Sequence, residues 1–185
     1  MENNHDARKQ QINAHIRKSG KVSLIITIIV LIWQILSFGY QFAYTIRQSD
    51  TLEIHSVLDI INYQPFGTVP DLIVKSLMTL GSLILLILLF NGLRKNGLPF
   101  TERNRKLVRN IGIIQGFQAL LPPVFRLIQN LPNKEYLDAR SNLIMTFFHP
   151  SNLNYFTLNI SVLLLFLSWI LRYGAELQQE SDETL

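Results

Sequence analysis

Few residues of this chain have the types and spacing that catalysis or metal binding requires. The sequence contains no H-E-x-x-H zinc motif, no G-x-S-x-G nucleophile motif and no glycine-rich phosphate loop. It also contains no cysteine, which excludes disulfides, thiolate zinc sites and thiol catalysis. The four histidines are scattered and have no nearby carboxylate pattern: His5, His15, His55 and His149. We therefore expect no catalytic residue, no metal site and no cofactor, and the protein is predicted not to be an enzyme.

Two amides stand out within an otherwise apolar segment. Gln115 and Gln118 are three residues apart, so they share one face of a helix, and Pro122 and Pro123 follow on the same segment. Such amides commonly form hydrogen bonds between membrane helices, which is the preferred interpretation. The alternative is that they line a cavity in a small oligomeric transporter or channel subunit. No acidic residue lies within any of the apolar segments, which weakens a proton-coupled mechanism.

The elements that carry these residues are long apolar segments. A membrane-spanning helix needs about 20 mostly apolar residues. The sequence contains a run of 25 residues, Val22 to Ile46, without a charged side chain or a histidine. The third of the predicted spans is the weakest because it contains the two amides and the two prolines. The sequence predicts an all-α, polytopic membrane protein with four spans, at about 22–43, 72–93, 107–128 and 156–173.

The distribution of basic residues predicts the orientation. Twelve of the 17 Lys and Arg residues would lie on one side of the membrane and three on the other. By the positive-inside rule, both termini are cytoplasmic. The chain then divides into a basic N-terminal segment (1–21), a four-helix transmembrane domain (22–173) and an acidic tail (174–185). The outer segments 44–71 and 129–155 are predicted to form short helices on the outer leaflet. The net charge of +4 follows from topology and needs no nucleic-acid partner.

The cytoplasmic loop between the second and third spans reads as a helical hairpin. Gly97 can end one helix in a left-handed turn, and Pro99 prevents that helix from continuing. Thr101 suits the N-cap of the next helix, and Phe100 before it can pack as a hydrophobic staple. This local pattern does not explain the residues at positions 104 and 109.

The tail carries carboxylates that face the same compartment as this basic loop. Glu176 or Glu180 could therefore pair with one of three loop cations, Arg103, Arg105 or Arg109. A tail that is merely solvated is an equally good interpretation, since exposed ion pairs contribute at most about 1 kcal/mol each.

Two stretches resemble a known family. The loop pattern G-x-P-F-T-x-x-N with a downstream R-N-I-G, and the ending R-Y-G-A-E-L-Q-x-E-S-D-x-T-L, are similar to the DUF2975 family of small four-span bacterial membrane proteins. The resemblance implies a protein of the bacterial inner (plasma) membrane with uncharacterised function. Genes of such proteins often lie beside one for a small helix-turn-helix regulator. The matching residues are Gly97, Pro99, Phe100, Asn104, Arg109, Gly174, Glu176, Leu177, Gln178, Glu180, Asp182 and Thr184.

These residues all fall on the predicted cytoplasmic side, which favours a binding role there. The leading hypothesis is a non-enzymatic binding or regulatory module, embedded in the lipid bilayer, whose cytoplasmic loop and tail engage a partner such as a helix-turn-helix regulator. The partner-binding candidates are the resembling residues except Leu177 and Thr184. A basic loop could equally bind anionic lipid headgroups. A homo-oligomer is left open, and direct nucleic-acid binding is not expected.

Overall fold

The secondary structure of the described chain is entirely helical. The computed structural model describes residues 2–50, 68–130 and 153–183. It contains four helices there, α1 (Glu2–Asp50), α3 (Thr68–Asn96), α4 (Glu102–Asn130) and α7 (Tyr155–Glu183). The all-α prediction is therefore confirmed for this part of the chain. The short helices predicted in the outer segments 44–71 and 129–155 lie largely outside the described residues.

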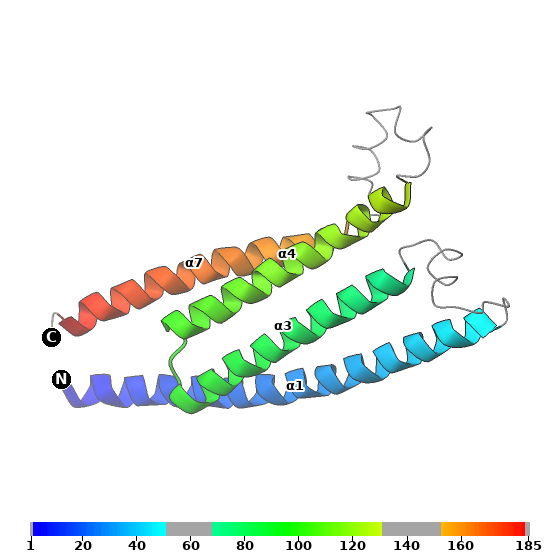
Figure 1. The fold of residues 1–185 in the computed structure, drawn as a ribbon. Helices are drawn as coiled ribbons and strands as arrows, with labels where there is room; N and C mark the ends of the chain where they lie inside the picture. The colour runs from blue at the N-terminus through cyan, green and yellow to red at the C-terminus, as the bar shows by residue number, and fades with distance from the viewer. Residues whose placement is uncertain (1, 51–67, 131–152, 184–185) are drawn as a thin grey trace.

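Two of the helices are much longer than the spans that the sequence predicts. α1 has 49 residues, which at 1.5 Å per residue makes it about 74 Å long. α7 has 29 residues and continues past the predicted end of its span into the acidic tail. Both free ends lie at the same end of the molecule, beyond the turn that joins α3 to α4 (Figure 1). The predicted basic segment and acidic tail are thus continuous with the helices they flank.

Among the described residues, three helices are long and apolar enough to cross a membrane: Gln10–Tyr44, Ile73–Asn96 and Tyr155–Leu177. They contain most or all of the first, second and fourth predicted spans, which supports the prediction of a membrane protein. α4 does not reach the same hydropathy, because it begins with a charged turn and contains Gln115, Gln118, Pro122 and Pro123. Whether α4 also crosses, and which compartment each end faces, stay predictions.

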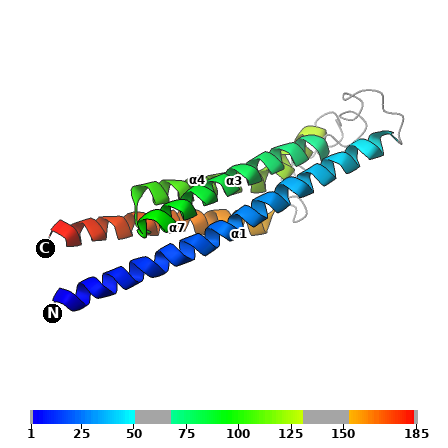
Figure 2. The same cartoon turned by 90° about the horizontal axis from the view of Figure 1, so that it is seen from below.

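The helices form a row in which each packs on the next. The extensive contacts are α1 with α3, α3 with α4, and α4 with α7. α1 and α7 therefore stand at the two edges of the row (Figure 1), and Figure 2 shows their labelled parts on the same side of α3 and α4. α4 lies between two strongly apolar helices, and its side chains Val108, Ile111 and Ala119 are buried. This position explains how the least apolar of the four helices is accommodated, because α3 and α7 cover much of its surface.

The edge helices expose large aromatic side chains. On α1, Trp33 is 71% exposed and Tyr40 74%, and on α7, Phe156 is 75% exposed and Trp169 69%. A protein in water rarely leaves so many large apolar side chains uncovered, whereas lipid tails cover them without cost. The exposed faces of α1 and α7 thus fit contact with a bilayer.

Candidate functional site

The candidate site is the end of the bundle where α3 turns into α4. Gly97 adopts a φ of +68°, the left-handed conformation that the sequence predicts for it. Its N–H donates to the Leu93 carbonyl at 2.9 Å, which closes the last turn of α3. A Cβ atom at this position would lie 3.1 Å from Arg17 Nε and 3.1 Å from the Asn13 carbonyl oxygen. Glycine is therefore required both by backbone conformation and by the close passage of α1.

Asn104 fixes the shape of this hairpin from within. Its side chain is only 4% exposed, and its Nδ2 donates to the carbonyls of Leu98 at 3.0 Å and Pro99 at 3.1 Å. Its backbone N–H donates to Thr101 Oγ1 at 3.1 Å. One buried amide thus gives the Leu98 carbonyl a donor and adds a second donor to the Pro99 carbonyl, which also accepts from the Thr101 N–H at 3.1 Å. This geometry explains why asparagine stands here, which the local sequence pattern does not.

The first turn of α4 is capped as predicted and carries a tight ion cluster. Thr101 is the N-cap, and Glu102 in the first turn accepts two hydrogen bonds from Arg105, at 2.5 and 2.6 Å. Lys106 Nζ lies 3.6 Å from the same carboxylate. The hydrogen bonds from Arg105, assisted by the charges of Arg105 and Lys106, lower the pKa of Glu102 to about 2. Glu102 is therefore ionised at any physiological pH.

The hairpin is joined directly to α7. A Cβ atom on Gly174 would lie 2.6 Å from Phe100 Cδ1 and 2.8 Å from Cε1, so the aromatic ring packs on the bare backbone of α7. One and a half turns earlier, Ser168 Oγ donates to the Arg105 carbonyl at 3.4 Å. The structure therefore brings together two of the predicted binding residues, Phe100 and Gly174, from stretches that lie 74 positions apart.

The acidic tail reaches the same cluster through its first carboxylate. Glu176 accepts a hydrogen bond from Arg172 Nε at 2.8 Å. The pKa of Arg105 is raised chiefly by its hydrogen bond to Glu102, and the charge of Glu176 adds to this. Of the predicted tail-to-loop contacts, Glu176 with Arg105 is thus supported as a proximity of charges. Arg103, Arg109 and Glu180 are exposed, and the side chains of Gln178 and Asp182 lie outside the described part of the structure.

Four apolar side chains remain uncovered around this junction. We call Leu98, Phe100, Tyr173 and Leu177 the hairpin patch; they are exposed by 39%, 41%, 64% and 47%. They lie among charged residues of α4 and α7, so they are unlike the continuous apolar faces further along the helices. A small apolar patch with a charged rim is typical of a surface that contacts another protein.

The two amides predicted within the third span hold α4 to α3. Gln115 Nε2 donates to Ser82 Oγ at 3.2 Å, and Gln118 Nε2 donates to Thr79 Oγ1 at 3.0 Å. The carbonyl Oε1 of Gln118 is buried and accepts no hydrogen bond from the described residues. These contacts favour the interpretation of the amides as links between helices over their interpretation as the lining of a cavity.

The seam between α4 and α7 depends on a motif that the sequence analysis missed. Gly112 and Gly116 form a G-x-x-x-G pair, and a Cβ atom at either would lie within 3.2 Å of α7 side chains. Ser161 of α7 is buried and donates to the Gly112 carbonyl at 2.7 Å. The four-residue spacing of these glycines, typical of closely packed membrane helices, is the signal that could have identified this seam.

The histidines and carboxylates of the described residues do not gather into one cluster. No group of three or more His, Asp or Glu side chains is close enough there to hold a metal ion. His55 and His149, the predicted outer-side histidines, lie outside the described residues.

Comparison with known proteins leaves the family open. No family model matches the chain, and no curated protein or solved structure was found to resemble it. Membership of the DUF2975 family therefore stays a prediction, which rests on the residues of the loop and the tail.

Proposed function

We propose that this chain is a non-enzymatic membrane protein whose hairpin end, together with the start of the tail, docks a soluble partner in the cytoplasm. The proposal includes four spans and cytoplasmic termini. α4 packs between two helices that are long enough to cross the bilayer and exposes apolar side chains such as Phe117, so it would cross with them. The charge asymmetry of the sequence supports a cytoplasmic location for the hairpin and both free ends.

The observation that carries the proposal is the joint between Phe100 and Gly174. It couples the loop and the tail into one surface, and Asn104 makes that surface rigid through two buried hydrogen bonds. A rigid apolar patch binds a partner with little loss of conformational entropy. Six of the ten predicted partner-binding residues lie at this junction, which supports it as the binding surface: Gly97, Pro99, Phe100, Asn104, Gly174 and Glu176.

The proposed partner is a soluble protein that presents apolar side chains within a rim of charge. The resemblance to the DUF2975 family makes a small helix-turn-helix regulator the first candidate. Binding would hold such a regulator at the membrane and away from DNA. Anionic lipid headgroups could occupy the nearby cations of α4 instead, and the capture experiment distinguishes them from a soluble partner.

The test is capture of a partner from cross-linked native membranes with the tagged, full-length chain. Leu98→Ala in the hairpin patch is compared with Leu88→Ala in the middle of α3, because both leucines are 39% exposed. We expect the double variant Leu98→Ala, Leu177→Ala to reduce the amount of captured regulator at least fivefold. The control Leu88→Ala should leave that amount unchanged. Equal capture by all variants, or no regulator captured by any, would overturn the proposal.

A further inference from the structure

The projecting ends of α1 and α7 carry opposite charges. Residues 8–21 of α1, here called the basic arm, contain five Lys or Arg residues and no Asp or Glu. Residues 173–183 of α7, here called the acidic arm, contain Glu176, Glu180, Asp182 and Glu183 and no Lys or Arg. Both arms are helical and extend past the α3–α4 turn at the same end of the molecule (Figure 1).

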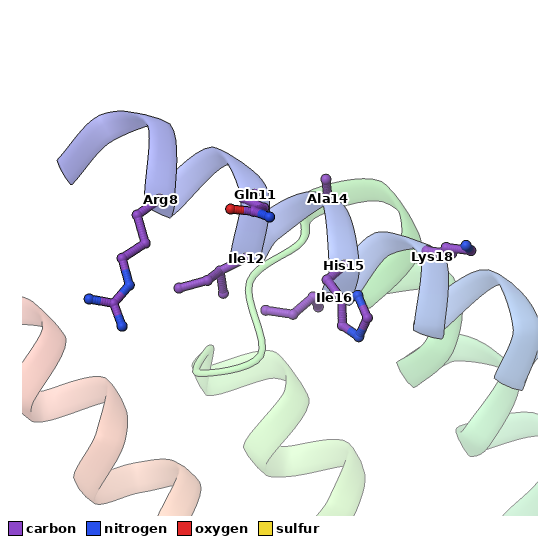
Figure 3. Close-up of a pocket in the computed structure, with 7 residues that line it drawn as sticks. All are labelled: Arg8, Gln11, Ile12, Ala14, His15, Ile16 and Lys18. Atoms are coloured by element: carbon purple, nitrogen blue, oxygen red, sulfur yellow. The ribbon is translucent and has the colours of Figure 1, made fainter. Parts of the chain in front are cut away.

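Each arm combines its charges with a short apolar stripe. On the basic arm, Ile12 and Ile16 lie one turn apart and line a groove of about 600 Å³ together with Arg8, His15 and Lys18. Figure 3 shows Arg8, Ile12, His15 and Ile16 pointing into the space between α1 and the neighbouring helices. On the acidic arm, Tyr173 and Leu177 are exposed and also lie one turn apart. The two arms are therefore complementary in both charge and apolar character.

Within one copy of the chain, the two arms are anchored at their bases to different parts of the row. At the base of the basic arm, a Cβ atom on Gly20 would lie 2.9 Å from the Arg94 nitrogen, so α1 packs directly on the end of α3. At the base of the acidic arm, Phe100 packs on Gly174 in the same direct way. The α3–α4 turn stands between these two fixed points, and the extensive contacts of the row do not include α1 with α7.

We propose that the basic arm of one copy pairs with the acidic arm of a second copy in the same membrane. α1 and α7 stand at the two edges of an open row. Two copies related by a twofold axis along the membrane normal would therefore bring α1 of each copy against α7 of the other. Both arm pairs then form at once, and the dimer closes without free edges. The partner of the basic arm is thus the acidic arm of a second copy. Every chain carries both arms, so no other protein is needed.

The helical rise sets the register of this pairing. The two arms run antiparallel. The basic arm leaves the predicted membrane edge near residue 22 and the acidic arm near residue 172, and each helix rises about 1.5 Å per residue from that edge. Lys18 is then level with Glu176, and His15 with Gln179. Each ion pair is exposed to water and contributes little by itself. Stability would come from several pairs together with Ile16 and Leu177, and it would decrease as salt screens the charges.

The absence of cysteine from the sequence makes the test direct. Two differently tagged full-length chains are co-expressed, one with His15→Cys and the other with Gln179→Cys, and native membranes are treated with a short bis-maleimide. The control pair uses Lys95→Cys with Gln179→Cys, since Lys95 is exposed at the same end but on α3, in the middle of the row. We expect a cross-linked species that carries both tags, at least fivefold stronger than in the control.

Two results would overturn the proposal. The first is the absence of the doubly tagged species while a single chain carrying both cysteines cross-links internally, which would mean that the arms pair within one copy. The second is no cross-link in either arrangement. Charge reversal provides a further check: Lys18→Glu should decrease the yield severalfold, and Lys18→Glu with Glu176→Lys in the opposite chain should restore it. Tyr173 and Leu177 belong to both the hairpin patch and the acidic arm, so the dimer would cover part of the proposed docking surface. The cross-link between two tagged chains requires no soluble partner, so a failure of the docking function would not prevent it.

Discussion

The Phe100 ring lies against the backbone of Gly174, with only 2.6 Å between its Cδ1 atom and the place that a methyl group on Gly174 would occupy. This contact joins the loop after α3 to the helix that ends the described chain. It also fixes where the acidic arm leaves the bundle, because α7 can approach the loop this closely only where it has no side chain. The position of the hairpin patch therefore depends on one glycine.

Replacing Gly174 by alanine should separate the hairpin from α7. The added methyl group would overlap the Phe100 ring, and overpacking of this kind typically costs about 1–3 kcal/mol. We expect a lower melting temperature in detergent, with recovery when Phe100→Ala is added. Gly39→Ala is the matched control, because a Cβ atom there meets nothing within 4 Å. A Gly174→Ala chain as stable as Gly39→Ala would contradict the packing described.

Asn104→Ala should loosen the hairpin turn. The substitution removes the side-chain donor of the Leu98 carbonyl, and an unsatisfied buried group costs about 1–3 kcal/mol. The Pro99 carbonyl loses one donor and keeps the Thr101 N–H at 3.1 Å. Asn104→Asp should be equally harmful because it retains the shape but has no N–H to donate. Limited proteolysis of the loop in membranes measures the effect, and the exposed Arg109→Ala serves as control. If Asn104→Asp were cleaved no faster than the parent chain, the two hydrogen bonds would not be what holds the turn.

A large side chain at Gly112 should disrupt the α4–α7 seam. A Cβ atom there would already lie 3.2 Å from atoms of Leu164 and Leu165, so Gly112→Leu has no room without displacement of α7. Gly81→Leu on α3 adds the same side chain at a position with nothing within 4 Å. We expect Gly112→Leu to lower the free energy of unfolding in mixed micelles by about 1–3 kcal/mol more than Gly81→Leu. Equal losses would mean that the seam is not closely packed.

The stability contributed by Glu102 should depend on pH. Its pKa is lowered from 4.5 to about 2 in the folded protein, so the folded state favours the ionised form. The contribution is complete above pH 4.5 and is lost as the pH falls from 4.5 towards 2. The melting temperatures of the parent chain and Glu102→Gln should therefore differ by a constant amount at neutral pH and converge near pH 2. A difference that persisted unchanged to that pH would exclude ionised Glu102 as its cause.

Single cysteines should report the topology of the four helices. With cytoplasmic termini and four spans, Ala14→Cys, Lys95→Cys and Gln179→Cys react with an impermeant maleimide only after the membrane is permeabilised. Arg47→Cys, near the far end of α1, reacts in intact cells. The result at Lys95 and Gln179 decides whether α4 crosses the bilayer. If these two positions were labelled from opposite sides, α4 would not span and the proposed surface would be split between compartments.

The sequence was sufficient to predict the helical fold and much of the hairpin. Apolar runs identify three helices directly, because a bilayer imposes the same length and composition on any span. Gly97 and Thr101 were also predictable, since helix ends leave backbone groups that only a few residue types satisfy. α4 was harder, because a helix covered by its neighbours needs less apolar surface than one that faces lipid.

What sequence reasoning could not find were the contacts between distant segments. The role of Asn104 depends on where the Leu98 and Pro99 carbonyls point, and that depends on the whole turn. The approach of Phe100 to Gly174 requires the packing of α7 on α4. The Gly112–Gly116 pair was within reach, because its spacing is visible in the sequence, but its partner Ser161 was not. Local patterns predict elements, whereas the joints between them depend on the assembled bundle.

The length of α1 gives the molecule a mechanical property. α1 is helical without interruption from Glu2 to Asp50, so its part within the bilayer and its basic arm form one stiff rod. If the rod tilts by about 10° around the membrane edge, the tip of the basic arm, which is about 21 Å long, moves sideways by about 4 Å. A change in bilayer thickness that alters the tilt of α1 would therefore be magnified at its free end, where the charges of the arm are placed.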